Sequence, residues 1–264
     1  WYYDELSGSF TITTSDATPA ADGLTGIDDA TDTLGVNPAA AASYLAVTSA
    51  TATPSAGTPF NVTVTAYDSY GNVATGYSGA KTLTFSGPGN APSGTAPAYT
   101  TNATFTSGAA ADLATTLYRA EAVSLDVAEG ALNSAGSADY DADLTVGPGT
   151  ANYFTVTSAT ATPSAGTPFN VTVTAYDQYG NLATGYSGAK TLAFSGPGNS
   201  PSGTAPVYTS SATFTSGVAA NLATTLYKAE AVSLDVAEGA LNSAGNADYD
   251  ADLTVGPGTA NYFT

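Results

Sequence analysis

Residues 60–67 read FNVTVTAY, in which apolar and polar side chains alternate without a break. A repeat of two residues is the period of a β-strand, and it places the apolar side chains on one face and the polar side chains on the other. β-Branched residues, which favour strands, fill half of the eight positions. The segment is therefore predicted to be a strand with one buried face.

The next five residues, 68–72 with the sequence DSYGN, are typical of a turn. An aspartate side chain accepts hydrogen bonds from the backbone that follows it, and glycine and asparagine tolerate a positive φ. The letters are superficially similar to part of a calcium-binding loop, but the remaining acidic ligands and the closing glutamate of an EF-hand are missing. We therefore interpret residues 68–72 as a plain turn.

Further strands are predicted on both sides of this segment. A loop rich in Gly, Pro, Asn and Ser occupies residues 86–97, and no segment shows a sustained helical period. About seven short strands within about 100 residues are typical of a β-sandwich, so the fold class is predicted to be all-β. The other predicted strands are 44–49, 81–85, 113–118, 122–127 and 139–146.

The chain of 264 residues repeats itself. Residues 44–152 recur as residues 153–261 with about thirteen mild differences, of which Asp112 against Asn221 is one. A period of this length is that of a whole domain rather than of a solenoid repeat. The two segments are therefore predicted to be near-identical sandwiches in tandem.

Both ends of the chain carry parts of the same pattern. Residues 262–264 repeat the start of the unit and are interpreted as the beginning of a further one. Residues 1–43 are predicted to be the C-terminal part of a diverged or incomplete sandwich. The corresponding residues are Leu34 with Leu144 and Phe10 with Val123.

Three stretches of the unit resemble the bacterial immunoglobulin-like repeats (Big-type) of surface and secreted proteins. They are TATPSAGTPFNVTVTAYDSYGNVATGYSG at 51–79, ATFTSG at 103–108 and LATTLYRAEAVSLDV at 113–127. The resemblance covers both full units and implies a tandem array of immunoglobulin-like β-sandwiches of about seven strands each in an extracellular setting. It implies no chemistry, because such repeats serve as stalks, spacers, shafts and sheath walls.

The charge of the chain narrows the classes of partner. There are 22 acidic residues against 4 basic ones, which gives a formal net charge of −18. Such a chain repels nucleic acid and anionic lipid surfaces, so both are excluded as partners. No run of eighteen apolar residues occurs, and membrane insertion is therefore not expected. The scarcity of Lys and Arg indicates an extracellular or cell-surface protein, with genomic or habitat bias as the alternative.

The residue inventory argues against an enzyme. The sequence contains no His and no Cys, so the Ser-His and Cys-His arrangements of nucleophilic catalysis cannot form and zinc loses its usual ligands. Paired carboxylates remain as candidates for glycoside hydrolysis, but they recur in each unit on a predicted solvent-facing side. A structural surface recurs in this way, whereas a catalytic site rarely does.

Three carboxylates per unit form the main candidate for a cation site. They alternate along the predicted strand 139–146 and would share one of its faces. Like charges at this spacing repel unless water or a cation screens them, and carboxylate oxygens suit Ca²⁺, the one cofactor considered. The alternative is a solvated acidic face that keeps the array soluble and blocks edge pairing. The residues are Asp139, Asp141 and Asp143, and in the second unit Asp248, Asp250 and Asp252.

Two kinds of covalent modification have candidate residues. Lys81 and Lys190 hold matching positions at the start of a predicted strand, where some surface immunoglobulin-like domains join a lysine to an asparagine by an isopeptide bond. An ordinary surface lysine is the alternative. Three asparagines match the pattern for N-linked glycans, a short pattern that often occurs by chance in Thr-rich sequence; they are Asn61, Asn102 and Asn170.

The functional prediction is an extracellular structural protein, such as a repetitive shaft, filament or sheath component. Assembly would proceed through other copies of the chain or adjacent domains, including head-to-tail β-strand addition to the incomplete sandwich of residues 1–43. The alternative is an adhesin stalk, or a spacer or carbohydrate-binding module of a larger secreted protein. In that case Tyr67 and Tyr77 are candidates for stacking on a glycan, and cross-strand packing is the competing interpretation.

Overall fold

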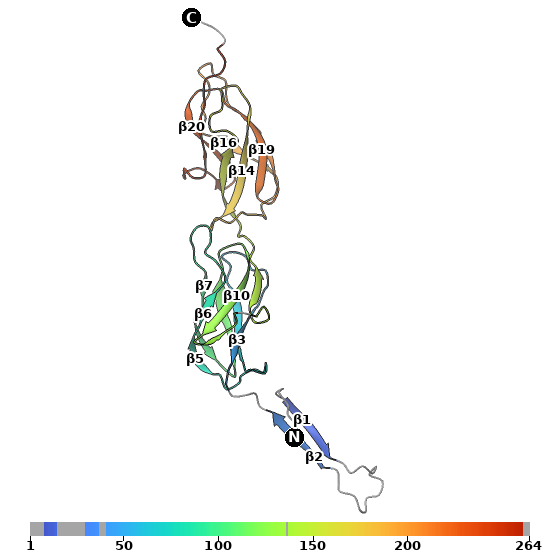
Figure 1. Ribbon diagram of the computed structural model, residues 1–264. Coiled ribbons are helices and arrows are strands. Elements are labelled where there is room, and N and C mark those ends of the chain that lie inside the picture. Colours follow the sequence, from blue (N-terminus) through green and yellow to red (C-terminus); the bar gives the residue numbers. More distant parts are fainter. Residues whose placement is uncertain (1–7, 15–29, 37–40, 136, 261–264) are drawn as a thin grey trace, which may run out of the picture.

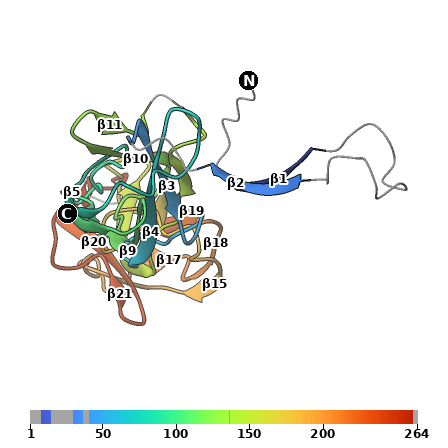
Figure 2. The same cartoon turned by 90° about the horizontal axis from the view of Figure 1, so that it is seen from below.

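The computed structural model describes residues 8–14, 30–36, 41–135 and 137–260, and every helix or strand assigned within them is a β-strand. From residue 44 onward two bodies of strands follow one another, and Figure 1 shows them end to end. In the view along the long axis they lie one behind the other (Figure 2). The described part of the chain contains no helix long and apolar enough to cross a membrane.

The first body has two main sheets and a small one. One main sheet has the strand order β3-β4-β9-β7, and in the other β10 pairs with β6, β11 and β12. Strands β5 and β8 form the small sheet. The bounds are β3 (Tyr44–Ser49), β4 (Phe60–Tyr67), β5 (Gly79–Thr82), β6 (Thr84–Ser86), β7 (Ala98–Tyr99), β8 (Asn102–Phe105), β9 (Ala109–Thr116), β10 (Ala122–Glu129), β11 (Leu132–Asn133) and β12 (Ala142–Thr145).

The second body repeats this topology strand for strand, with β13-β14-β19-β17 in one sheet, β20 paired with β16, β21 and β22 in the other, and β15 paired with β18. The chain therefore contains two tandem immunoglobulin-like β-sandwiches, the first and the second sandwich. The bounds are β13 (Ala151–Ser158), β14 (Phe169–Asp177), β15 (Gly188–Thr191), β16 (Ala193–Ser195), β17 (Val207–Tyr208), β18 (Ser211–Phe214), β19 (Val218–Thr225), β20 (Ala231–Glu238), β21 (Leu241–Asn242) and β22 (Ala251–Thr254).

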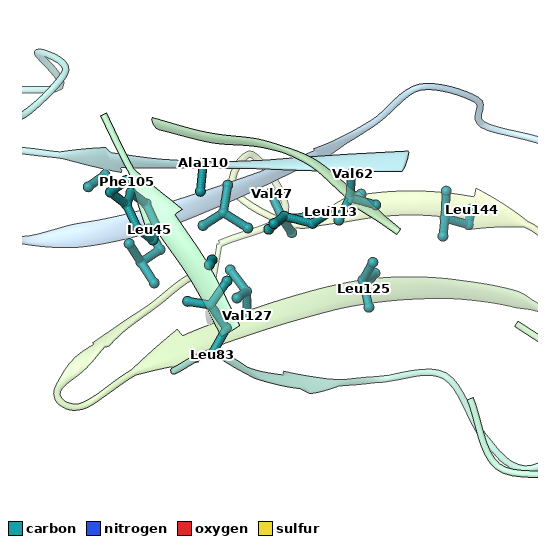
Figure 3. Packing of buried hydrophobic residues seen from close by; sticks show 14 of the residues in the cluster. Leu45, Val47, Val62, Leu83, Phe105, Ala110, Leu113, Leu125, Val127 and Leu144 are labelled. Carbon is teal, nitrogen blue, oxygen red and sulfur yellow. The ribbon is translucent and has the colours of Figure 1, made fainter. Parts of the chain in front are cut away.

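The core of each sandwich lies between its main sheets, as Figure 3 shows for the first sandwich. Val62 and Val64 of β4 are 1% and 0% exposed, and they belong to the same cluster as Leu125 and Val127 of β10. The alternation predicted for residues 60–67 is confirmed, because the apolar side chains are buried or partly buried and the polar ones between them are not buried.

One predicted strand, 81–85, is divided in the structure. Strand β5 pairs with β8, whereas β6 pairs with β10 in a main sheet. Leu83 lies between the two strands, is 2% exposed and donates its N–H to the carbonyl of Thr101 at 2.7 Å. The chain thus changes partner strands at a buried residue. This division, with the short strands β7, β8 and β11, is why each sandwich has ten strands instead of about seven.

The predicted strand 139–146 is shorter than expected and begins only at Ala142. Tyr140 bonds to the other sheet, because its carbonyl accepts the N–H of Val47 at 2.8 Å and its ring stacks on Tyr44 with centroids 4.2 Å apart. This contact holds the chain away from β10 until residue 142. Only Asp143 of the three candidate carboxylates therefore lies on a strand.

A β-bulge explains one of the differences between the two units. The register of β4 against β9 shifts between Val62 and Val64, and Asp112 in the bulge has a φ of 57°. Asn221 holds the same place in the second sandwich with a φ of 59°. Asp and Asn are the side chains that best tolerate this left-handed conformation, so the exchange is neutral for the backbone.

A segment between β3 and β4 closes one end of the sandwich. Ala56 donates its N–H to the carbonyl of Gly147 at 2.8 Å, and Gly147 donates to Pro54 at 2.8 Å. Residues 54–56 therefore run parallel to the end of the domain, as the parallel bridge between Ser55 and Gly147 also records. The chain leaves the first sandwich at this end and continues into the second sandwich.

Strands β1 (Gly8–Thr14) and β2 (Ala30–Val36) form a separate antiparallel pair. Phe10 lies opposite Leu34, and the corresponding Val123 lies opposite Leu144 in the first sandwich. The other residues of segment 1–43, apart from 41–43, and residues 262–264 lie outside the described residues. Their assignment to an earlier and a later unit stays a prediction.

Candidate functional site

The most elaborate arrangement of polar groups in the described residues is the joint between the two sandwiches. Residues 177–181 of the second sandwich, the joint turn, begin at the last residue of β14 and contact the end of the first sandwich. That end is the tail surface, made of residues 55–57, 91–93, 118–120 and 147–149. The joint turn has the sequence DQYGN and is the second copy of the predicted turn 68–72.

The side chain of Asp177 stabilises the joint turn by hydrogen bonds to the backbone of the turn itself. The residue is fully buried, and its Oδ1 accepts the backbone N–H groups of Tyr179 and Asn181, each at 2.9 Å. Gly180 has a φ of +82°, which favours glycine over residues with a side chain. The turn prediction and its mechanism, an aspartate bonded to the backbone that follows it, are confirmed for this copy.

The second oxygen of the same carboxylate bonds to the chain that connects the two sandwiches, at Gly149. Oδ2 of Asp177 accepts the N–H of Gly149 at 2.8 Å and the side-chain amide of Asn181 at 2.8 Å. Hydrogen bonds to an ionised acceptor are about twice as strong as those between neutral groups. Asp177 thus ties the turn of one sandwich to the chain that leaves the other.

Asn181 makes the direct bonds between the sandwiches. Its Oδ1 accepts the N–H of Ala120 at 2.9 Å, and its Nδ2 donates to the carbonyl of Tyr118 at 2.8 Å as well as to Asp177. The side chain is 5% exposed. The acceptor and both amide hydrogens have partners, so the orientation of the amide is determined by its surroundings.

Tyr179 packs the apolar side of the joint. Its ring lies against that of Tyr118 with centroids 4.9 Å apart, and its carbonyl accepts the N–H of Ser93 at 3.0 Å. The ring also covers Gly57, where a Cβ atom would lie 2.4 Å from ring atoms of Tyr179. Only glycine leaves room for the ring at this place on the tail surface.

A groove of about 950 Å³ runs beside the joint. Gly57, Gly149 and Asp177 belong to its lining, together with Tyr186 and Leu241 of the second sandwich. The Asp177 carboxylate is already bonded to four N–H groups, so it is engaged in structure rather than presented to a ligand. The groove is therefore a feature of the joint.

The structure separates the candidate carboxylates of the predicted calcium site. Asp139 is exposed in the turn before β12, and Asp143 is exposed and accepts the hydroxyl of Ser124 at 2.6 Å. Asp248 and Asp252 repeat this, with Ser233 bonded to Asp252 at 2.6 Å. Among the described residues no three Asp, Glu, His or Cys side chains gather in a way that could hold a metal ion. The calcium site stays a prediction.

Asp141 and its copy Asp250 are partly buried, and one oxygen of each, Oδ1, is enclosed without a hydrogen-bond partner. Burial raises the pKa of Asp141 above its ordinary value, and the charges of Asp143 and Asp126 raise it further. The pKa of Asp250 is raised in the same way. The folded state therefore binds the proton more tightly than the unfolded state. The stability from each carboxyl is complete below its ordinary pKa and is lost as the pH rises through the raised pKa.

We expect the double substitution Asp141→Asn and Asp250→Asn to stabilise both sandwiches at pH 7, because it removes a charge that faces other carboxylates. The gain should be about 0.5 kcal/mol per sandwich, or about 3 °C in melting temperature. It should vanish near pH 3, where Asp141 and Asp250 are protonated because their pKa values are raised. Calorimetry at both pH values measures it. If these carboxylates bound calcium, millimolar Ca²⁺ would raise the melting temperature of the parent chain and not that of the variant, and the parent chain would then be the more stable of the two.

The two candidate lysines lie over tyrosine rings. Nζ of Lys81 is 4.7 Å from the ring centroid of Tyr77, and Nζ of Lys190 is 4.9 Å from that of Tyr186. Tyr77 in turn donates its hydroxyl to Glu129 at 2.6 Å, and burial raises the pKa of the Tyr77 hydroxyl. These contacts fit a cation over an aromatic face, and the isopeptide bond stays a prediction.

The remaining candidates for binding are at the surface or packed against neighbours. Asn61, Asn102 and Asn170 are exposed, and Asn61 donates its side-chain amide to Asp112 at 3.2 Å. Tyr67 stacks on Tyr44 with centroids 5.3 Å apart, which is the cross-strand packing named as the alternative to sugar stacking. Glycan attachment stays a prediction.

Comparison with protein-family models finds no match, and neither does comparison with curated proteins. Three solved structures of bacterial surface proteins are similar in part. The Escherichia coli adhesin FdeC is 22% identical over 88% of this chain and 69% of its own, with a TM-score of 0.42. The Yersinia pseudotuberculosis adhesin InvE is 18% identical over 80% and 58%, with a TM-score of 0.33. Domains 4–9 of the surface layer protein SbsC are 14% identical over 96% and 36%, with a TM-score of 0.30.

The chain thus spans less than two thirds of the InvE and SbsC structures. All three TM-scores are below 0.5, so the assignment of the fold rests on the strand pairing of the two sandwiches themselves.

Proposed function

We propose that this chain is a stalk or spacer segment of a longer protein on the bacterial surface, and that its neighbours there are adjacent domains of the same protein. The joint carries this proposal. Four hydrogen bonds cross it: the backbone N–H groups of Gly149, Ala120 and Ser93 donate three of them, and the carbonyl of Tyr118 accepts the fourth. The two side chains that organise the joint, Asp177 and Asn181, are buried. Bonds in this arrangement fix the direction of one sandwich relative to the next, which is what a spacer requires.

Two further observations support a mechanical role over a chemical one. The sequence has no His and no Cys, which removes the usual nucleophile–base pairs. The groove beside the joint is lined by an aspartate whose oxygens are committed to the joint. The proposal therefore assigns no reaction to the chain.

The stalk is favoured over a filament built by strand addition. Both sandwiches have the same ten strands in the same order, so neither of these two domains offers an incomplete sheet. Strand addition to the segment 1–43 stays a prediction. Near-identical consecutive units joined by one kind of contact suit a part whose role is length.

The experiment measures how rigidly the joint holds the two sandwiches. Because the chain has no cysteine, Thr82→Cys and Thr191→Cys would place one spin label on the exposed part of each sandwich. Electron–electron distance measurements should give one narrow distribution. Asn181→Ala removes both direct side-chain bonds, worth about 2 kcal/mol together, and should broaden it.

Asn72→Ala is the matched control, since it makes the same change in the first sandwich and away from this joint. It should leave the distribution narrow. A broad distribution in the parent chain would overturn the proposal, because two domains that move freely relative to each other cannot act as a spacer of fixed length.

A further inference from the structure

The end of the second sandwich repeats the tail surface of the first in residue type. Ala165 and Gly166 stand where Ala56 and Gly57 stand, and the other corresponding residues are identical except at Arg119 and Ala91. These pairs are Tyr118 with Tyr227, Ala120 with Ala229, Pro148 with Pro257, and Gly149 with Gly258. The chain therefore carries a second tail surface, defined as residues 164–166, 200–202, 227–229 and 256–258.

The second tail surface is already formed. Ala165 donates its N–H to the carbonyl of Gly256 at 2.9 Å, and Gly166 donates to Leu226 at 2.8 Å. The same bonds in the first sandwich, from Ala56 to Gly147 and from Gly57 to Leu117, are both 2.8 Å. The backbone that receives the joint turn is thus built in the same way at both ends.

The two tail surfaces differ in what covers them. Ala56 is 5% exposed and Ala120 and Gly149 are partly buried, whereas Ala229 and Gly258 are exposed. Within residues 137–260 the N–H groups of Ala229 and Gly258 have no hydrogen-bond partner. Their counterparts in the first sandwich bond to Asn181 and Asp177. The second tail surface therefore exposes the backbone N–H groups of Ala229 and Gly258 as hydrogen-bond donors. The carbonyl of Tyr227 is the corresponding acceptor, and Gly166 leaves room for an aromatic ring.

We infer that the second tail surface binds the Asp-x-Tyr-Gly-Asn turn of a further copy of the same repeat. The turn's carboxylate would accept the N–H of Gly258, its asparagine would bond to Ala229 and Tyr227, and its tyrosine ring would cover Gly166. This inference rests on the proposed stalk function. It adds the partner and the direction of growth, since turn and tail are different surfaces and a contact between them extends head to tail.

The substitutions between the units leave this contact intact. Arg119 is replaced by Lys228, whose side chain pairs with Glu230 at 2.7 Å as Arg119 pairs with Glu121 at 3.2 Å. Ala91 of the first tail surface is replaced by Ser200 in the second. The bonds to the joint turn come from backbone groups, which the changes of side chain do not remove.

The test compares amide hydrogen exchange, followed by NMR, in this chain and in a chain in which a copy of residues 153–261 follows residue 261. In both chains the amides of Ala120 and Gly149 should exchange slowly, because the joint covers them. Those of Ala229 and Gly258 should exchange fast in the present chain and about tenfold more slowly in the extended one. A matched extended chain, with alanine for the asparagine that corresponds to Asn181 in the added copy, should restore fast exchange at Ala229.

The outcomes separate this inference from the proposal on which it rests. Fast exchange at Ala229 in the extended chain, with slow exchange at Ala120, would overturn the inference and leave the stalk proposal standing. Fast exchange at Ala120 in the present chain would overturn the stalk proposal itself. Slow exchange at Ala229 in the present chain would also overturn the inference, because the surface would then be covered without a further repeat.

Discussion

The substitution Gly196→Ala is expected to unfold the second sandwich selectively. Gly196 follows β16 with a φ of +103°, and a Cβ atom there would lie 2.0 Å from the backbone oxygen of Ser233. That oxygen belongs to β20, which pairs with β16, so the added Cβ would force the backbone of one of the two strands to move. Left-handed strain and this clash together should cost about 4 kcal/mol or more.

Calorimetry measures the effect. The transition of the second sandwich should fall by about 20 °C, whereas that of the first should stay in place. Gly203→Ala is the control, since its φ is +88° and nothing lies within 4 Å of the added Cβ, so that only the backbone strain of about 1–2 kcal/mol remains. Gly87→Ala should mirror the result in the first sandwich, where the clash is with Ser124 at 2.0 Å. Equal shifts for the Gly196 and Gly203 variants would contradict the prediction.

The substitution Asp177→Ala should destabilise the second sandwich and loosen the joint at once. It removes the acceptor of the backbone N–H groups of Tyr179, Asn181 and Gly149. Buried donors left without an acceptor cost about 1–3 kcal/mol each, so a loss of about 3 kcal/mol is expected after partial rehydration. Denaturant unfolding gives the loss in stability, and the spin-label distances give the loss of order at the joint.

Asp177→Asn divides the two roles of this side chain. An asparagine keeps one oxygen for the turn, but it presents an NH₂ group to the N–H of Gly149 and to the amide of Asn181. The second sandwich should therefore keep most of its stability while the distance distribution broadens. If Asp177→Asn and Asp177→Ala lost the same stability, the carboxylate would not hold the turn in the way described.

Much of the fold follows from local patterns. The strand 60–67 was predicted with the bounds that β4 has, because strict alternation leaves only one set of side chains for the core. The long loop and the tandem repeat were also read from the sequence. The strand predicted at 113–118 is β9, which spans Ala109–Thr116. Two further details were wrong: the segment 81–85 is divided at Leu83, and the acidic segment 139–146 enters its strand only at Ala142. In both places the chain changes its partner strand, and an alternating pattern looks the same whichever strand lies beside it.

The joint is the part that sequence reasoning missed. Residues 68–72 were interpreted as a plain turn, and no residue of the second copy was named as a contact between domains. A weak signal was present, because Ser69 changes to Gln178 while the Asp, Tyr, Gly and Asn of the motif stay the same. With about thirteen differences over a whole unit, however, most residues stay the same.

The sequence by itself determined that the chain is an array of all-β units, since periodicity, turn residues and repetition are local properties of the chain. The tertiary structure decided what the repeated turn does. The groups that receive it are the N–H of Ala120 and Gly149 and the carbonyl of Tyr118. Nearly every residue carries such backbone groups, so they leave no trace in the order of side chains. Only the folded ends of two sandwiches bring them within reach of one aspartate and one asparagine.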